Sequence, residues 1–315
     1  MIGLSDSIEA QQRLRGHILE TPLLRVPALD SVAGCQVYLK AENLQLTGSF
    51  KIRGAMNSLL QLTAEQRRAG VVTASSGNHA KAVSWAASKL SLDVHVVMPH
   101  NPNPSKLEAI RALGATVLFA GTASSERAAK ARELQAMGKV LVHSHADEAV
   151  IAGQGTIGLE IVEACPQIDT IVVPVGGGGL ISGIATAIKG LSNQIKVVGV
   201  EPSGAPRYTE SLKSGFPVTL GHVDTIADGT RCDHADPGNY RRIQEMVDEI
   251  TLVDEESIKA ALRACVLDAK IIAEPSSCLG LASAMSKTLS VDTHEKVCFV
   301  ITGGNNDIQM LKSLL

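Results

Sequence analysis

Short β-branched runs alternate with longer helical patterns along most of the chain, and this alternation constrains the fold more than any other feature. Helices are predicted from Phe50, from Asn78 and near Pro104. The predicted strands between the helical patterns are QVYLKAEN, GVVTAS, DVHVVMP, TVLFA, KVLVHS, DTIVVPV, KVVGVEP, EITLV and KVCFVIT. The sequence therefore predicts an α/β fold with mainly parallel sheets covered by helices on both faces.

Four of the predicted strands lie close together in the chain, between Gly70 and Ser144, and the flanking segments have longer connections. We therefore expect a small lobe at residues 70–147, inserted into a large lobe formed by residues 1–69 and 148–315. Residues 214–239 contain many turn-forming residues and little helical periodicity. This segment is predicted to be a loop at the mouth of a site.

Composition and charge exclude several classes of partner. The chain of 315 residues is 45% hydrophobic and carries a net charge of -3, with no basic stripe for nucleic acid or an anionic membrane. No stretch reaches the apolar length of a membrane span, and the polar N-terminal segment is unlike a signal peptide. Its six cysteines are scattered, which is typical of a reducing compartment. We expect a cytoplasmic protein that binds small molecules.

Four consecutive glycines, Gly176, Gly177, Gly178 and Gly179, follow the strand TIVVPV and precede a helix. Unpaired amides at a helix N-terminus can surround a phosphate. Four glycines also lose much conformational entropy on folding, so the run indicates that a ligand or another backbone segment comes close to this loop. A simple tight turn is the alternative. A dinucleotide site is another, because residues 177, 179 and 182 approximate G-x-G-x-x-G and Glu201 ends the next strand.

Two further turns follow predicted strands, where parallel sheets bind ligands. The turn SSGNH comprises Ser75, Ser76, Gly77, Asn78 and His79. Its hydroxyls, amide and free N–H groups suit a carboxylate, although an ordinary helix cap explains them equally well. The turn GGNND follows Thr302 and on its own indicates no more than a turn.

Lys51 lies in TGSFKIRGA, in the first turn of a predicted helix. The positive end of the helix dipole disfavours a cation there and should lower the lysine pKa, which makes a better amine nucleophile. An exposed lysine without a special role is the alternative. A phosphate-binding loop, a carboxylate turn and such a lysine together are the parts that pyridoxal phosphate chemistry requires.

The chain resembles the fold type II pyridoxal phosphate enzymes, and among them the serine racemase and threonine dehydratase group. The motifs SFKIRGA, SSGNH, VIAGQGTIGLEI, VPVGGGGLISGI, TIADG and GGNND carry this resemblance over nearly the whole chain, in the family's order. The resemblance implies a large lobe that holds the cofactor, a small mobile lobe that carries SSGNH, and a homodimer.

The same resemblance implies roles for individual residues. Lys51 would bond covalently to the cofactor and serve as the base that removes the α-proton, with Phe50 packed on the ring. Asn78 would bond the ring hydroxyl, Thr302 would meet the pyridine nitrogen, and Glu274 would lie near the same edge of the ring. The glycine loop would hold the phosphate. The substrate would bind at Ser75, Ser76, Gly77, Asn78 and His79.

The expected reaction is loss of the β-hydroxyl from L-serine, L-threonine or 3-hydroxyaspartate, which gives a 2-keto acid and ammonia. Ser76 stands where biosynthetic threonine dehydratases usually have alanine, so it would add a proton donor on the other face of the ring and permit serine racemisation. An acidic substrate could pair with His79, Arg127 or Arg231. The rival functions are an NAD-dependent oxidoreductase built on the glycine loop and Glu201, and a catalytically silent amino acid sensor.

The sequence departs from the family pattern in places. Serine racemases bind a divalent cation through a glutamate, a carbonyl and an aspartate. Here Glu201 and the Ala205 carbonyl remain, but Arg207 stands in place of the aspartate, so a magnesium site is not expected. Residues around His145 differ from the nucleotide-contacting ones, so no ATP activation is expected. The chain ends soon after Asp307, so no feedback inhibition by isoleucine is expected.

Overall fold

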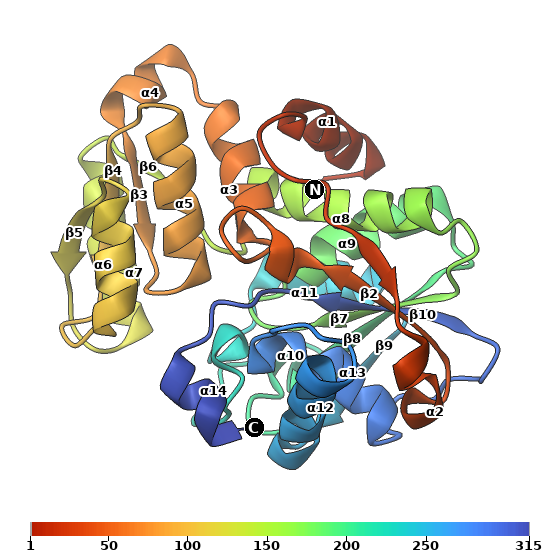
Figure 1. The fold of residues 1–315 in the computed structure, drawn as a ribbon. Coiled ribbons are helices and arrows are strands. Elements are labelled where there is room, and N and C mark those ends of the chain that lie inside the picture. The colour runs from red at the N-terminus through yellow and green to blue at the C-terminus, as the bar shows by residue number, and fades with distance from the viewer. Residues whose placement is uncertain (1, 315) are drawn as a thin grey trace.

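The computed structural model describes residues 2–314, which form two sheets with helices packed against them (Figure 1). The larger sheet has the strand order β1-β2-β10-β7-β8-β9, with bounds Leu23–Arg25, Gln36–Ala41, Lys296–Ile301, Thr170–Pro174, Lys196–Pro202 and Glu249–Val253. The smaller sheet has the order β5-β4-β3-β6, with bounds Thr116–Phe119, Val94–Met98, Val71–Ala74 and Val140–Leu141. All pairings are parallel except β1 with β2, which confirms the predicted α/β class.

The large sheet is buried on both faces because its side chains alternate between two cores. Val172 of β7 packs in one core with helices α2 (Asp30–Ala33), α12 (Glu255–Leu267) and α13 (Leu279–Met285). Ile171 and Val173 of the same strand pack in the other core with α8 (Glu148–Ala164), α9 (Gly179–Leu191) and α11 (Pro237–Met246). This two-sided burial explains why the strands appear in the sequence as continuous apolar runs.

The small sheet lies to the left in Figure 1 and carries helices α5 (Asn78–Lys89), α6 (Pro104–Ala112) and α7 (Ser124–Ala136). Its main core also contains Ile52, Met56 and Leu59 from α3 (Lys51–Leu60), a helix outside the predicted insert. Helix α3 therefore packs on both α5 and α8 and joins the two sheets. The lobe boundaries at residues 70 and 147 stay a prediction.

A buried ion cluster fixes α3 to the large sheet. Arg53 donates to Glu42 at 2.8 Å and to Glu160 at 2.5 Å, and Lys40 of β2 donates to Glu160 at 2.5 Å. All four side chains are buried. Each charge has a partner, which a buried ion requires, and the cluster orients the helix that begins with Lys51.

The remaining described elements complete the chain. The helices are α1 (Leu4–Leu14), α4 (Ala64–Ala69), α10 (Arg207–Ser214) and α14 (Ile308–Leu314), and the 3-10 turns are η1 (Pro27–Leu29), η2 (Glu42–Leu44), η3 (Asp228–Thr230) and η4 (Pro275–Ser277). The predicted loop at 214–239 contains η3, one isolated bridge between Thr219 and His234, and the start of α11. Between residues 2 and 314, no helix combines the length and apolar character that crossing a bilayer needs. All six cysteines are free thiols.

Candidate active site

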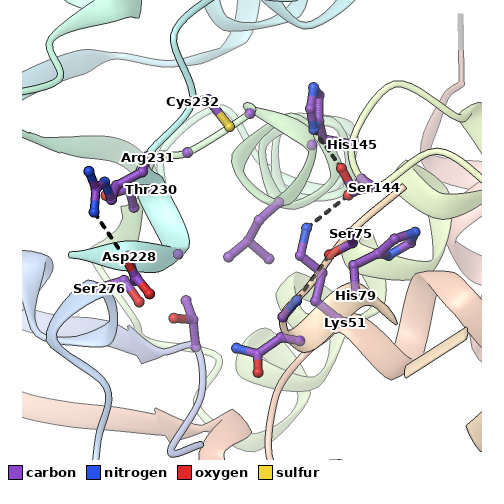
Figure 2. Close-up of a pocket in the computed structure, with 18 of the residues that line it drawn as sticks. Lys51, Ser75, His79, Ser144, His145, Asp228, Thr230, Arg231, Cys232 and Ser276 are labelled. Atoms are coloured by element: carbon purple, nitrogen blue, oxygen red, sulfur yellow. Dashed lines mark hydrogen bonds and ion pairs between the residues drawn. The ribbon is translucent and has the colours of Figure 1, made fainter. Parts of the chain in front are cut away.

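A cavity of about 440 Å³ lies beyond the carboxyl ends of β3, β7 and β10 (Figure 2). Each of these strands leads directly into one of the predicted turns, so the topology brings the three turns together. Every site residue predicted from the sequence lines this one cavity: Phe50, Lys51, Ser75, Ser76, Gly77, Asn78, His79, Gly176, Gly177, Gly178, Gly179, Glu274 and Thr302.

Lys51 begins α3, and its amine faces the cavity (Figure 2). Its Nζ donates to the Ser144 carbonyl at 2.8 Å and lies 5.0 Å from the centre of the Phe50 ring. Burial lowers the pKa of Lys51 to about 8. The predicted direction of the shift is therefore correct, but its main cause is desolvation rather than the helix dipole. With this pKa, about a tenth of the amine is unprotonated at pH 7, far more than for an ordinary lysine, and the neutral form is the one that a nucleophile or base requires.

The glycine loop turns its carbonyls away from the cavity. Arg207 donates to the Gly176 carbonyl, Tyr208 donates to the Gly177 carbonyl at 2.9 Å, and Asn239 donates to the same oxygen at 3.0 Å. Within residues 2–314, none of the four glycine amides donates to a protein acceptor. Unpaired amides at the start of α9 form a concave donor set that suits a phosphate.

Protein neighbours also require glycine in this loop. Gly178 has φ +87°, and a Cβ there would lie 2.4 Å from the Tyr208 hydroxyl. A Cβ at Gly177 would lie 2.3 Å from Cγ of His145. The close approach predicted for this loop is therefore made partly by side chains of the protein itself.

Substitution of Gly178 by alanine tests this loop. Both the positive φ and the collision with Tyr208 should displace the loop, so we expect cofactor affinity to fall about tenfold or more, in a fluorescence or absorbance titration of the apoenzyme. The matched control is Gly34→Ala, because Gly34 has φ +74° but open space around its Cβ. The control should lower the melting temperature without changing cofactor affinity. Equal affinity in both variants and the wild type would contradict the assignment of the loop.

The SSGNH turn opens helix α5 without the side-chain cap that the alternative interpretation requires. Gly77 is the N-cap residue, and Ser75 Oγ accepts only a long hydrogen bond of 3.3 Å from its amide. The Ser76 hydroxyl has no partner in the described chain. His79 is buried, its Nε2 contacts the Val142 carbonyl at 3.1 Å, and burial lowers its pKa to about 3. A neutral His79 cannot form an ion pair with a substrate carboxylate.

Asn78 belongs to a polar network that connects the two sheets. Its Nδ2 donates to Glu274 at 2.9 Å, and Asn305 Nδ2 donates to Asn78 Oδ1 at 2.9 Å. The Asn305 amide also donates to Glu274 at 2.8 Å. Burial raises the pKa of Glu274. Sequence reasoning gave Asn305 no role, although it lies in the GGNND motif.

Thr302 directly follows β10, with its side chain buried at the cavity wall. Its Oγ1 lies 2.9 Å from the Ser277 hydroxyl, which also contacts the amide and the carbonyl of Gly303 at 2.8 Å. The cavity wall therefore presents a neutral hydroxyl at this point. Such a group leaves a pyridine nitrogen largely unprotonated.

Comparison with known proteins decides among the open alternatives. The family described as "Pyridoxal-phosphate dependent enzyme" matches residues 14–303. An L-threonine ammonia-lyase of Thermotoga maritima is 42% identical over 100% of this chain and 78% of its own length. The chain belongs to the pyridoxal-phosphate-dependent enzymes.

Solved structures agree with this family. Maize serine racemase superposes with a TM-score of 0.94 at 35% identity, over 99% of this chain and 96% of that one. A pyridoxal 5'-phosphate-dependent aspartate racemase superposes with a TM-score of 0.90 at 35% identity, over 98% of both chains. The relatives named here are an ammonia-lyase and two racemases, which does not favour the alternative of an NAD-dependent oxidoreductase. In agreement, Glu201 is fully buried and does not line the cavity.

Basic side chains gather at the mouth of the cavity of this pyridoxal-phosphate-dependent enzyme. Arg127 donates to the Thr122 carbonyl at 2.8 Å, and burial lowers its pKa. Arg231 and Lys106 lie 3.5 and 3.7 Å from Asp228. Of these cations, sequence reasoning missed only Lys106, which lies on α6 far from any motif. All three cations line the cavity, and so does Asp228.

The residues at the position of the serine racemases' divalent cation site do not fit a metal ion. Glu201 and the Ala205 carbonyl are present, but the Arg207 guanidinium contacts both, at 4.0 and 2.9 Å. Within the described chain, no group of three or more His, Cys, Asp or Glu side chains is arranged to hold a metal. His145 packs under the glycine loop, with its Nδ1 2.9 Å from Ser144 Oγ.

Proposed function

We propose that this enzyme removes the β-hydroxyl of a small β-hydroxy amino acid, L-serine, L-threonine or 3-hydroxyaspartate, and releases a 2-keto acid and ammonia. We propose in addition that it racemises serine. The observation that carries the proposal is the buried, easily deprotonated Lys51 amine in the same cavity as four unpaired glycine amides. The named relatives, a threonine ammonia-lyase and a serine racemase, support both activities.

The cavity fits pyridoxal phosphate in charge and in shape. The amides of Gly176, Gly177, Gly178 and Gly179 would hold the phosphate, Phe50 would pack on the ring, and Asn78, Glu274 and Thr302 would contact its edge. When bound, the cofactor supplies an aldehyde that bonds amines and a ring that withdraws electrons from the α-carbon. The neutral Thr302 hydroxyl weakens this withdrawal, which suits elimination because the leaving hydroxyl takes the electrons.

Lys51 and Ser76 divide the proton chemistry in this proposal. With a pKa of about 8, the Lys51 amine accepts the α-proton of the substrate at neutral pH and returns a proton to the departing hydroxyl. The Ser76 hydroxyl has no partner in the described residues and is free to deliver a proton to the α-carbon from the other face. One group on each face is what inversion of the α-carbon requires.

Substrate carboxylates would meet two parts of the cavity. The free N–H groups at the start of α5 suit the α-carboxylate, because they lie at the positive end of the helix. Arg127 and Arg231 suit a side-chain carboxylate, which favours 3-hydroxyaspartate as one substrate. The similarity to an aspartate racemase supports this option. Following the family resemblance and the six free thiols, we propose a cytoplasmic homodimer.

Incubation of the holoenzyme with each of the three amino acids tests the proposed function. We expect keto acid and ammonia in equal amounts from at least one of them, and D-serine from L-serine by chiral chromatography. Before substrate is added, the holoenzyme should absorb visible light, and borohydride should remove this absorbance. A coloured protein without turnover would indicate a sensor, and a colourless protein after reconstitution would contradict the cofactor assignment.

A further inference from the structure

Arg207 is a fully buried arginine that no step of the proposed reaction uses. Its guanidinium lies among backbone carbonyls from three separate segments. The four acceptors are the carbonyls of Val175 at 3.5 Å, Gly176, Ala205 at 2.9 Å and Thr230 at 2.7 Å. One side chain thus connects the end of β7, the start of the glycine loop, the turn before α10 and the 3-10 turn η3.

A carboxylate completes this cluster. Glu201 Oε1 lies 4.0 Å from the guanidinium, and the two oxygens accept the amides of Tyr208 and Thr209 at 3.0 and 2.9 Å. Burial raises the pKa of Glu201, and the charge of Arg207 opposes that shift. A carboxylate and several carbonyls are the ligands that hard divalent cations prefer. Here they surround a guanidinium, whose charge is permanent.

The cluster acts on the wall of the cofactor cavity. The Gly176 carbonyl that Arg207 holds belongs to the loop whose amides face the cavity, and Thr230 lines the same cavity. Tyr208, the next residue along α10, holds the Gly177 carbonyl. Consecutive side chains of one helix therefore fix consecutive carbonyls of the loop, which orients the opposite amides toward the ligand.

We propose that Arg207 is a built-in cation that takes the place of a divalent metal ion and positions the glycine loop, so that stability and cofactor retention do not depend on metal. The proposal rests on the proposed function only in assigning the cofactor phosphate to that loop. It further implies that Arg207→Asp, which removes the guanidinium and adds a carboxylate beside Glu201, converts the cluster into a site that responds to magnesium or calcium.

The first test needs no variant. The melting temperature of the wild-type holoenzyme, and its cofactor content after gel filtration, are measured with EDTA, with magnesium chloride and with calcium chloride. We expect all three conditions to give the same values. A clear loss of melting temperature or of cofactor in EDTA, restored by either ion, would overturn the proposal.

The second test compares three variants. Arg207→Met keeps the side-chain length without the charge, and we expect cofactor affinity to fall about tenfold, with no response to metal. In EDTA, Arg207→Asp should show the same loss of cofactor affinity. In magnesium or calcium, its cofactor affinity should recover and its melting temperature should rise. The matched control is Arg242→Met, because Arg242 of α11 is also buried and pairs at 2.5 Å with Glu148 of α8. It should lower the melting temperature without changing cofactor affinity.

Each outcome decides the matter. Normal cofactor affinity in Arg207→Met, or a folded Arg207→Asp that responds to neither ion, would overturn the proposal. If Arg207→Asp does not fold, the wild-type test and Arg207→Met still decide it. Keto acid production is not a readout here, and the response of the melting temperature to metal can be measured on the protein without cofactor. Failure of the proposed reaction is therefore distinguishable from failure of this inference.

Discussion

Replacement of Lys51 by alanine is expected to abolish both the visible absorbance of the holoenzyme and its production of keto acid. Among the described residues that line the cavity, Lys51 carries the buried amine, and its pKa is about 8, so its loss removes the attachment point of the cofactor and the base together. We expect turnover to fall about 10⁴-fold or more, the upper range for a positioned acid–base group. Absorbance spectra and keto acid assays measure the two effects.

Two further variants serve as controls for Lys51→Ala. Lys51→Arg keeps a positive charge that cannot be lost, and it should be as inactive as the alanine variant because a permanent cation is neither nucleophile nor base. Lys89→Ala removes a lysine near Trp85 at the far end of α5 and should leave both readouts unchanged. Visible absorbance and turnover that persist in Lys51→Ala would refute the assignment of Lys51.

Substitution of Ser76 by alanine is expected to separate the two activities. Without the hydroxyl, no proton reaches the α-carbon from that face, so racemisation should fall about 10²-fold or more. Elimination needs only Lys51 and should fall by less than about tenfold. Chiral chromatography of serine and a keto acid assay on the same sample give the ratio of racemisation to elimination.

Ser75→Ala provides the comparison for Ser76→Ala. Ser75 contacts the Gly77 amide within the same turn, so its loss should disturb substrate binding for both reactions in proportion. A ratio of racemisation to elimination that stays unchanged in Ser76→Ala would remove Ser76 from the proton chemistry.

The alternation of strands and helices predicted the sheets well, for a physical reason. The central strands β7 and β3 are buried on both faces, so their apolar runs are continuous and unmistakable. The sequence does not predict strand β1, because its three residues are too few to show a pattern and none of them is buried. The packing of α3 against the small sheet could not be predicted, because it depends on tertiary contacts.

The site residues were predictable where they lie just after a strand: Ser75 and Thr302 follow β3 and β10 directly, and Gly176 lies two residues after the end of β7. Residues that support the site from elsewhere left no such signal. Tyr208 and Asn239 hold the glycine loop from α10 and α11, and Asn305 reaches the SSGNH turn from the end of the chain. The main cause of the lowered Lys51 pKa could not be predicted from the sequence either, because it is the burial of the side chain in the folded protein.

The central claim is that Lys51 bonds covalently to pyridoxal phosphate, and its most direct test is reductive trapping. The holoenzyme is reduced with borohydride and digested, and the peptides are mapped by mass spectrometry. The account predicts the cofactor mass on the peptide that contains Lys51, and on none that contains Lys40, Lys81 or Lys106. Trapping on another lysine, or no trapped cofactor in a preparation that still forms keto acid, would contradict it.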